Sequence, residues 1–160
     1  MLSRIRIVLL ALPLTAALSF AAGTAWARNG APAPLESRIY HTADAHRSSG
    51  AWGWIDMFAD GATTAGTDSM LVAELVFLPG KNLHPAHRHP NEEFQYIVEG
   101  RGTWSLNGQD SPATKGDVMY AKAGDMHGLT NTSNAPLRFF VVKWVSKGGP
   151  HTIVAPDSGR

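Results

Sequence analysis

Two histidines separated by a single residue make up the stretch of this sequence best suited to chemistry. His87 and His89 lie two apart, and side chains two apart on an extended strand point to the same face. Glu93 follows after a Pro-Asn break and could add a carboxylate oxygen from the next strand. His127 lies downstream, in a second glycine-containing stretch. Three imidazoles and one carboxylate suit a divalent transition metal and leave positions open on a six-coordinate ion.

Short apolar runs bounded by turn residues are the elements expected to position these side chains. The Asn107-Gly108 pair is a strong hairpin signal, and a first strand is expected near 38–41. Segment 51–58 is left open between strand and short helix, and 60–67 reads as a loop. The other expected strands are 69–78, 94–98, 103–106, 117–121, 127–130 and 137–145. Many short strands without a long helix indicate an all-β barrel or sandwich.

The N-terminal segment predicts a secretory signal peptide over residues 1–27. Two arginines precede an apolar run that ends at a small-x-small cleavage signal, although a membrane anchor is the rival interpretation. The remaining chain divides into a flexible lead-in at 28–37, one domain at 38–147 and a tail at 148–160. Cleavage would leave 12 Lys and Arg against 13 Asp and Glu, a net charge of −1. A periplasmic or secreted location follows from this interpretation.

Composition narrows the classes of partner. The sequence has no cluster of Lys and Arg, which argues against a nucleic-acid partner. Because cysteine is absent, disulfides and thiolate chemistry are excluded, and the fold must depend on its core. After signal cleavage no stable membrane insertion is expected. The candidate partners are a small-molecule ligand or substrate and a second copy of the chain.

The spacing of these residues resembles the two motifs of the cupin superfamily. The first motif, a Gly followed by His-x-His, Glu and Gly, matches Gly80, His87, His89, Glu93 and Gly100. The gap after Gly80 is one residue longer than usual. The second motif matches Gly116, Gly124, His127 and Asn131, with Lys122 where proline is usual. That departure affects turn stiffness and no expected ligand.

This resemblance implies a small antiparallel jelly-roll barrel with a metal in its mouth. It implies His87, His89, Glu93 and His127 as ligands of one divalent metal, which by ligand type is Fe, Mn, Ni or Zn. Such proteins include dioxygenases, isomerases, decarboxylases and lyases, and the ligand set does not select among them. A non-catalytic binding module and a cupin whose metal only staples the barrel remain alternatives. The catalytic residues stay unassigned.

Several residues near the motifs keep more than one interpretation. Glu92 competes with Glu93, but the spacing to Gly100 favours Glu93. His84 could support one of the ligands from behind, could be an alternative ligand, or could lie in the entrance loop. The last interpretation is favoured. Glu74 faces either the cavity or an exposed edge, because a buried carboxylate must be paired or protonated. Gln95 shares the parity of Glu93 and is expected to line the cavity.

Overall fold

The structure, a computed structural model, describes residues 33–152. The expected signal peptide lies outside the described residues. Within the described range one 3-10 turn, η1 (Thr42–Asp44), is the only helical element. The strands are β1 (His46–Gly50), β2 (Gly53–Ala62), β3 (Thr67–Phe77), β4 (Glu92–Glu99), β5 (Arg101–Leu106), β6 (Gln109–Thr114), β7 (Val118–Ala121), β8 (His127–Thr130) and β9 (Leu137–Ser146).

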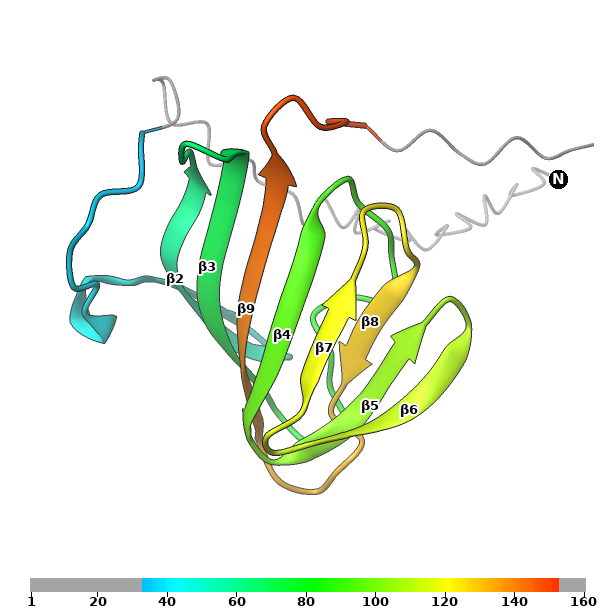
Figure 1. Cartoon of the computed structure of the whole chain (residues 1–160). Coiled ribbons are helices and arrows are strands. Elements are labelled where there is room, and N and C mark those ends of the chain that lie inside the picture. The colour runs from blue at the N-terminus through cyan, green and yellow to red at the C-terminus, as the bar shows by residue number, and fades with distance from the viewer. Residues whose placement is uncertain (1–32, 153–160) are drawn as a thin grey trace, which may run out of the picture. The chain divides into compact units, whose positions relative to one another are not determined.

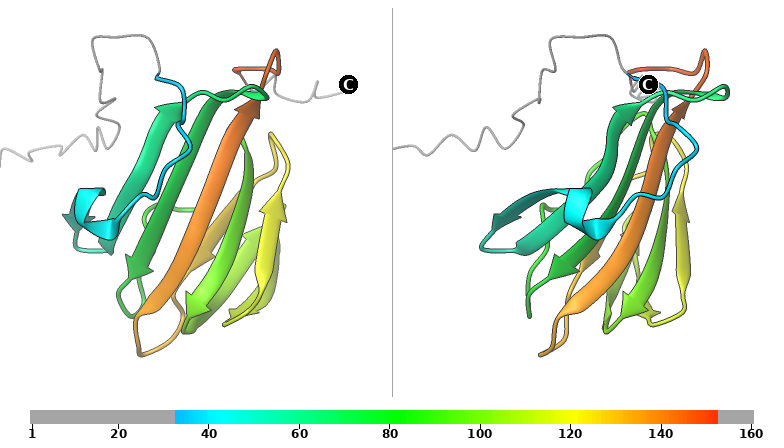
Figure 2. Two further views of the ribbon diagram at one scale, coloured as in Figure 1. Left: turned by 60° about the vertical axis from the view of Figure 1, so that its left-hand side comes forward. Right: turned by 90° about the vertical axis from the view of Figure 1, so that its left-hand side faces the viewer.

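The strands form two antiparallel sheets, which lie as two layers in Figures 1 and 2. The larger sheet has the order β1-β2-β3-β9-β4-β7, and the smaller has the order β6-β5-β8. The chain passes between them at the β4–β5, β6–β7, β7–β8 and β8–β9 connections. The predicted all-β antiparallel class is confirmed. The expected barrel is not closed, because in residues 33–152 no strand ladder runs from one sheet into the other.

Two glycine-dependent turns determine where β5 lies. Gly100 joins β4 to β5 with a φ of 86°, and a Cβ there would lie 2.6 Å from the Pro136 carbonyl oxygen. A side chain at this position would therefore strain the backbone and clash. At the other end, Asn107 and Gly108 have φ values of 50° and 81°, the left-handed pair of a two-residue hairpin turn. The predicted hairpin is confirmed by the pairing of β5 with β6.

The strand predicted at 38–41 is wrong. This segment is irregular, and Ile39, the residue that would anchor it, is 77% exposed. The Arg38 guanidinium lies 4.4 Å above the Tyr40 ring instead. A strand here would gain no buried face, so the first strand begins later, at β1.

Segment 51–58, left open from the sequence, forms most of β2 and pairs with both β1 and β3. The loop expected at 60–67 is shorter, because β2 continues to Ala62 and β3 begins at Thr67. Register shifts within the second half of β2 allow its small residues to stay in the ladder. The other six predicted strands agree with the observed ones to within about two residues, whereas β1 and β6 had no predicted range.

Apolar side chains from both sheets fill the space between the layers. Ile97 and Leu137 have no exposed surface, and Phe77 and Phe139 pack edge to face with ring centroids 4.9 Å apart. Trp104 from the smaller sheet is 7% exposed and belongs to this core. Without cysteine, this core and the strand ladders stabilise the fold.

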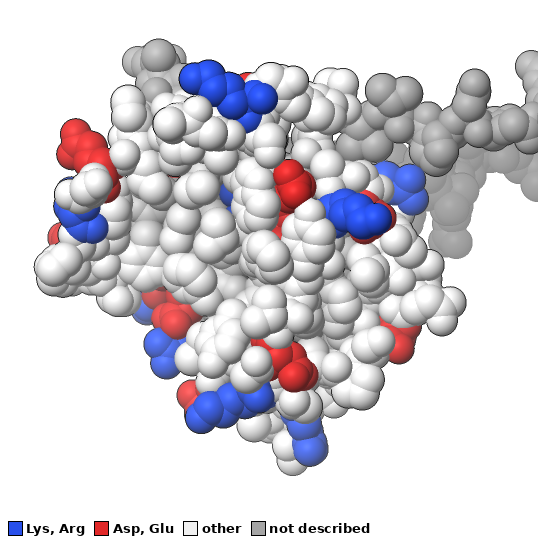
Figure 3. Space-filling model, in the orientation of Figure 1, with Lys and Arg blue, Asp and Glu red and all other residues white. Residues whose placement is uncertain are grey.

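Lys and Arg are interspersed with Asp and Glu on the face drawn in Figure 3, with uncharged surface between the small charged groups. Residues 33–152 contain no helix with the length and hydrophobicity that crossing a membrane requires.

Candidate metal centre

Two segments distant in sequence bring the four predicted ligands together. His87 and His89 lie on the loop before β4, Glu93 is the second residue of β4, and His127 is the first residue of β8. The backbones of His87 and His127 form an isolated antiparallel bridge. In this bridge the His87 N–H donates to the His127 carbonyl at 2.9 Å, and the reverse bond is 2.8 Å. The loop is therefore fixed to the start of β8.

A glycine turn before β8 makes a second attachment to the same loop. Gly124 has a φ of 84°, as expected for a turn position, and its N–H donates to the His89 carbonyl at 2.9 Å. The next residue, Asp125, offers its carbonyl oxygen to Nδ1 of His127 at 2.9 Å. This turn consequently orients the His127 imidazole and holds the backbone at His89.

The three imidazoles converge. The ring centroids of His87 lie 5.0 Å from those of both His89 and His127, and the last two are 4.7 Å apart. One ligand nitrogen from each ring lies within 4.8 Å of the others. The two-residue spacing does place His87 and His89 together, although the loop is not a regular strand. His127 is 1% exposed, and the other two are half-buried.

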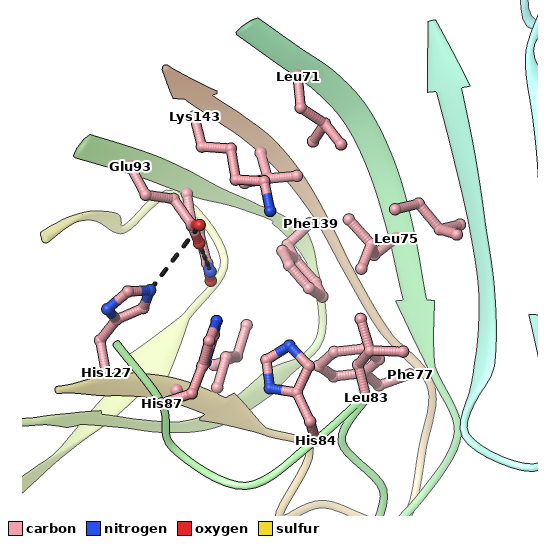
Figure 4. A pocket seen from close by; sticks show the side chains of 15 residues that line it. Leu71, Leu75, Phe77, Leu83, His84, His87, Glu93, His127, Phe139 and Lys143 are labelled. Carbon is pink, nitrogen blue, oxygen red and sulfur yellow. Dashed lines mark hydrogen bonds and ion pairs between the residues drawn. The ribbon is translucent and has the colours of Figure 1, made fainter. Parts of the chain in front are cut away.

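Glu93 lies beside the imidazoles, as the sequence predicts, and is buried. Its Oε2 lies 3.1 Å from Nε2 of His89 and 3.8 Å from Nε2 of His127, the pair joined by a dashed line in Figure 4. Its Oε1 accepts a hydrogen bond from Nε2 of Gln95, which shares the inner face of β4. Gln95 therefore holds the carboxylate and, as expected, lines the cavity.

The backbone contacts determine which ring nitrogens carry hydrogen. A carbonyl oxygen only accepts, so Nδ1 of His127 must donate to Asp125, and Nδ1 of His89 must donate to the Asn91 carbonyl at 3.2 Å. In the neutral rings the Nε2 atoms then carry lone pairs, and these lone pairs face the Glu93 carboxylate. Nε2 of His127 and Nδ1 of His87 are buried without a hydrogen-bond partner.

This arrangement fits a divalent metal. Lone pairs on imidazole nitrogen and carboxylate oxygen repel one another unless protons or a cation lie between them. Imidazole nitrogen with one carboxylate oxygen is a donor set typical of Fe, Mn, Ni and Zn sites. The structure brings together all four residues predicted from the sequence, while ligation itself stays a prediction.

The pKa values follow from burial and from these contacts. Burial, and then the neighbouring histidines, lower the pKa of His87 to about 4. Burial acts to raise the pKa of Glu93, but its close contacts with His127, His89 and Gln95 outweigh it and hold the pKa well below its usual value. Burial acts to lower the pKa of His127, but the Glu93 carboxylate 3.8 Å away and the hydrogen bond to the Asp125 carbonyl outweigh it and raise the pKa above 6.5.

A cavity of about 90 Å³ opens beside His87, Glu93 and His127 (Figure 4). Apolar side chains form most of its wall, and these are Ile55, Leu71, Leu75, Phe77, Leu83, Leu129, Phe139 and Val141. A metal at the cluster would face this space and would not be closed off by protein. Open coordination positions are the feature that separates catalytic from structural sites.

Lys143 is a cavity residue that the sequence reasoning missed. It lies on β9 directly opposite Glu93 of β4 and is partly buried. Figure 4 shows its ammonium turned into the cavity. Strand parity could have found it, because Lys143 shares the inward phase of Phe139 and Val141 in an otherwise apolar run.

His84 lies at the mouth of the cavity. It is exposed, its ring centroid is 4.0 Å from that of His87, and its Nδ1 lies 3.1 Å from the Pro85 carbonyl. It is not one of the three histidines whose nitrogens converge. Its position suits the entrance-loop interpretation better than that of a ligand.

Glu92 and Glu74, the two other carboxylates considered, point away from the cavity. Glu92 accepts a hydrogen bond from the Tyr120 hydroxyl at 2.6 Å on the outer face of the larger sheet, so Glu93 is the inward residue. Glu74 faces neither the cavity nor an exposed edge, because β3 lies inside the sheet. It accepts a hydrogen bond from Nε of Arg138 at 2.8 Å, which supplies the partner a carboxylate in this position needs.

Asn131 braces the end of β8. It has no exposed surface, and its Nδ2 donates to the carbonyls of Phe77 at 2.9 Å and Ala135 at 2.8 Å. Its Oδ1 accepts from both the N–H and the hydroxyl of Ser133. One amide thereby joins the end of β3 to the β8–β9 turn.

Comparison with known proteins identifies this arrangement. Residues 73–143 match the cupin domain family. This matched segment carries all four predicted ligands and is similar to the cupin domain. An oxalate-binding protein from Thermotoga maritima is 37% identical over 73 residues, which cover 45% of this chain and 60% of that protein. An uncharacterized protein from Methanocaldococcus jannaschii is 34% identical over 46% of this chain and 58% of that protein. The matches thus span about 60% of the length of these curated relatives.

Solved structures agree on the fold. The crystal structure of a predicted oxalate decarboxylase from Thermotoga maritima is 26% identical and superposes with a TM-score of 0.53, covering 68% of this chain and 99% of that one. A double-stranded β-helix protein from Klebsiella pneumoniae gives a TM-score of 0.55 at 23% identity, covering 74% and 100% of the two chains. The second likeness concerns the fold alone.

Proposed function

We propose that this chain is a mononuclear metal-dependent enzyme that acts on a small carboxylic acid. One divalent transition metal is held by His87, His89, Glu93 and His127. The observation that carries the proposal is the cavity of about 90 Å³ that opens onto these donors. Unpartnered buried nitrogens beside such a cavity are what a metal with open positions requires.

The same cavity argues against a metal that only staples the sheets together. A structural site is closed by protein ligands, whereas here an additional acid or base lies near the donors. His84 stands at the mouth, and Lys143 extends into the space. Both can move a proton or hold a charged group, which is the second requirement of a catalytic site.

Each polar residue of the site has a defined task in this proposal. When bound, a divalent ion supplies Lewis acidity toward a carboxylate or carbonyl oxygen. Gln95 holds Glu93 by donating to Oε1, and the backbone carbonyls of Asn91 and Asp125 hold two imidazoles in the ligating tautomer. The apolar wall limits water around the bound acid, which strengthens its interactions with charged groups.

The relatives support a small acid as the ligand. The names of one curated relative and one solved structure, both from Thermotoga maritima, refer to oxalate. Residues 73–143, which match the cupin domain family, contain the donor residues and Lys143. The size of the cavity is consistent with a molecule of that order. The metal identity and the reaction, among dioxygenase, isomerase, decarboxylase and lyase types, are left to experiment.

A non-catalytic binding protein is the second candidate, because one relative is named only for binding oxalate. Turnover separates the two. Protein loaded in turn with Mn, Fe, Ni or Zn is incubated with small carboxylic acids, and products are followed by NMR. Turnover that disappears in His127→Ala supports the enzyme. Tight binding without turnover supports the binding protein, and equal behaviour of wild type and His127→Ala contradicts both.

We further propose that the protein is exported to the periplasm or secreted, on the basis of the N-terminal sequence pattern alone. Self-association into a homodimer also stays a prediction. Neither bears on the chemistry of the site.

A further inference from the structure

The cavity has two ends of opposite character. His87, Glu93 and His127 lie together on one side of Figure 4, and the labelled apolar residues lie on the other. That apolar side is formed by Leu71, Leu75, Phe77, Leu83 and Phe139. The ammonium of Lys143 points into the space between these two ends. A ligand that fills the cavity must therefore match a charged end and an apolar end.

Within residues 33–152, Lys143 has no anionic partner of its own. The carboxylate oxygens of its cross-strand neighbour Glu93 contact Gln95 and the histidines. Glu93 forms no ion pair with Lys143 within 4.0 Å. No other carboxylate lines the cavity, whose other polar residues are histidines and Gln95. A partly buried ammonium beside apolar side chains is costly unless an anion accompanies it.

The charges of the site leave room for an anion. With a divalent ion bound, one Glu93 carboxylate and one Lys143 ammonium give a local net charge of about +2. A ligand carboxylate facing Lys143 would reduce that excess. A neutral or cationic head group would leave Lys143 unpaired in a partly apolar space.

We propose that Lys143 binds the carboxylate of the substrate and that the substrate also carries a short apolar substituent, which packs on Leu71, Leu75 and Phe139. This inference rests on the proposed function, because it names the substrate class of the same site. It differs from oxalate recognition, since oxalate has no apolar part to place on that wall. The cavity of about 90 Å³ restricts the substituent to a short one.

Removal of the lysine charge gives the first test. Lys143→Met keeps the length of the side chain and removes the ammonium, while Lys115→Met makes the same change on an exposed turn of the smaller sheet. Cobalt-loaded proteins are titrated with lactate and with its neutral amide, lactamide, and the visible cobalt spectrum is followed. Lactate should bind Lys143→Met about 10- to 100-fold more weakly, as loss of a charge-assisted hydrogen bond implies. Lactamide binding and cobalt content should not change, and Lys115→Met should match wild type.

A ligand series gives the second test. Glycolate, lactate and 2-hydroxybutyrate share one head group and differ by one carbon each. Burial of each added carbon on the apolar wall should tighten binding about fourfold. The increments should be the same in wild type and in Lys143→Met, because they arise at the other end of the cavity.

The outcomes are distinct. Lactate affinity in Lys143→Met within twofold of wild type overturns the role of the lysine. Affinity that stays level or falls along the series overturns the apolar substituent. If Lys143→Met does not fold, Lys143→Arg retains the charge and must keep the preference for lactate over lactamide, and loss of that preference overturns the proposal. Cobalt-loaded wild type that binds none of these acids overturns the proposed function as well.

Discussion

His89 and His127 each donate one ring N–H to a backbone carbonyl, and this leaves the other nitrogen free to bind a cation. Such carbonyl contacts fix the tautomer and the orientation of a metal-binding imidazole and raise its basicity. Because these contacts leave a lone pair on Nε2 of His89, the Glu93 carboxylate oxygen 3.1 Å away would repel that nitrogen if nothing lay between them. Either a proton or a metal must occupy that space.

Removal of His89 should damage metal binding far more than removal of His84. His89→Ala deletes one of the three converging nitrogens, whereas His84→Ala deletes an exposed ring at the cavity mouth. Loss of a residue that only hydrogen-bonds to a metal ligand costs about 10- to 100-fold in metal affinity. Loss of the ligand His89 itself in His89→Ala should therefore cost more than about 100-fold. His84→Ala should cost less than about tenfold. Competitive chelator titration measures both, and similar losses would show that the wrong histidines have been assigned.

Metal affinity should fall as the pH is lowered, and His127 and His87 should contribute to the fall at different pH values. The raised pKa of His127 means that a proton competes with the metal already above pH 6.5. We therefore expect affinity to drop at least about tenfold per pH unit below that point. The pKa of about 4 at His87 delays the proton of that residue, so its contribution to the slope should appear only near pH 4. Equilibrium dialysis from pH 8 to pH 4 tests this, and retention that stays flat would argue against histidine ligation.

In the metal-free protein, His87 and His127 should change the free energy of unfolding in opposite directions as the pH changes. The folded-state pKa of His87 lies below its unfolded value near 6.5, so its contribution is present above pH 6.5 and is lost as pH falls toward about 4. The folded-state pKa of His127 lies above that value, so its contribution is present below pH 6.5 and is lost as pH rises through the raised pKa. Urea unfolding of wild type and single variants separates the two.

At the scale of elements, the site depends on how β8 and the loop before β4 are held. Asn131→Ala removes the amide that joins β3 to the β8–β9 turn and leaves buried carbonyls without a donor. We expect a loss of about 2–4 kcal/mol in the free energy of unfolding. Metal affinity should fall as a consequence, because β8 carries His127.

Asn134→Ala supplies the matched control, since Asn134 lies exposed in the same turn. It should change stability by no more than about 0.5 kcal/mol. Chemical denaturation of both variants gives the comparison. Equal stability of the two variants would show that the Asn131 amide does not brace the fold.

Most elements were predictable because local chemistry determines them. The Asn107-Gly108 turn needs no tertiary context, and the alternation around Gln95 correctly assigned the inner face of β4. The strand predicted at 38–41 failed because strand formation there depends on a buried face that the neighbouring strands do not provide. Segment 51–58 stayed open for the same reason, since its pairing with β1 and β3 is non-local.

The site was predictable in its ligands and less so in its surroundings. The His-x-His spacing suggested that His87 and His89 lie together, and the resemblance to the two cupin motifs implied Glu93 and His127 as their partners. Lys143 was missed, since its approach to Glu93 requires the β4–β9 register, which sequence periodicity does not give. The open edge between the sheets was also beyond prediction, because closure of a barrel is a property of all strands together.

At the scale of the whole molecule, we expect the N-terminal signal peptide to be removed on export. Expressed in a bacterial host with a periplasm, the chain should be cleaved after Ala27, so the mature protein begins at Arg28. Ala27→Arg removes the small residue at the cleavage site and should leave the longer chain attached to the membrane. Intact-mass measurement of each fraction tests this. Wild type that retains its first residues in the membrane fraction would instead support the rival anchor.

We expect His87, His89, Glu93 and His127 to bind one metal ion in each chain. Purified protein is loaded with an excess of a divalent transition metal, desalted and assayed by elemental analysis, alongside His87→Ala, His127→Ala and the Lys115→Met control. We expect close to one metal per chain in wild type and in the control, and little metal in the two histidine variants. Wild type that stays metal-free at neutral pH, or histidine variants that retain a full equivalent, would contradict it.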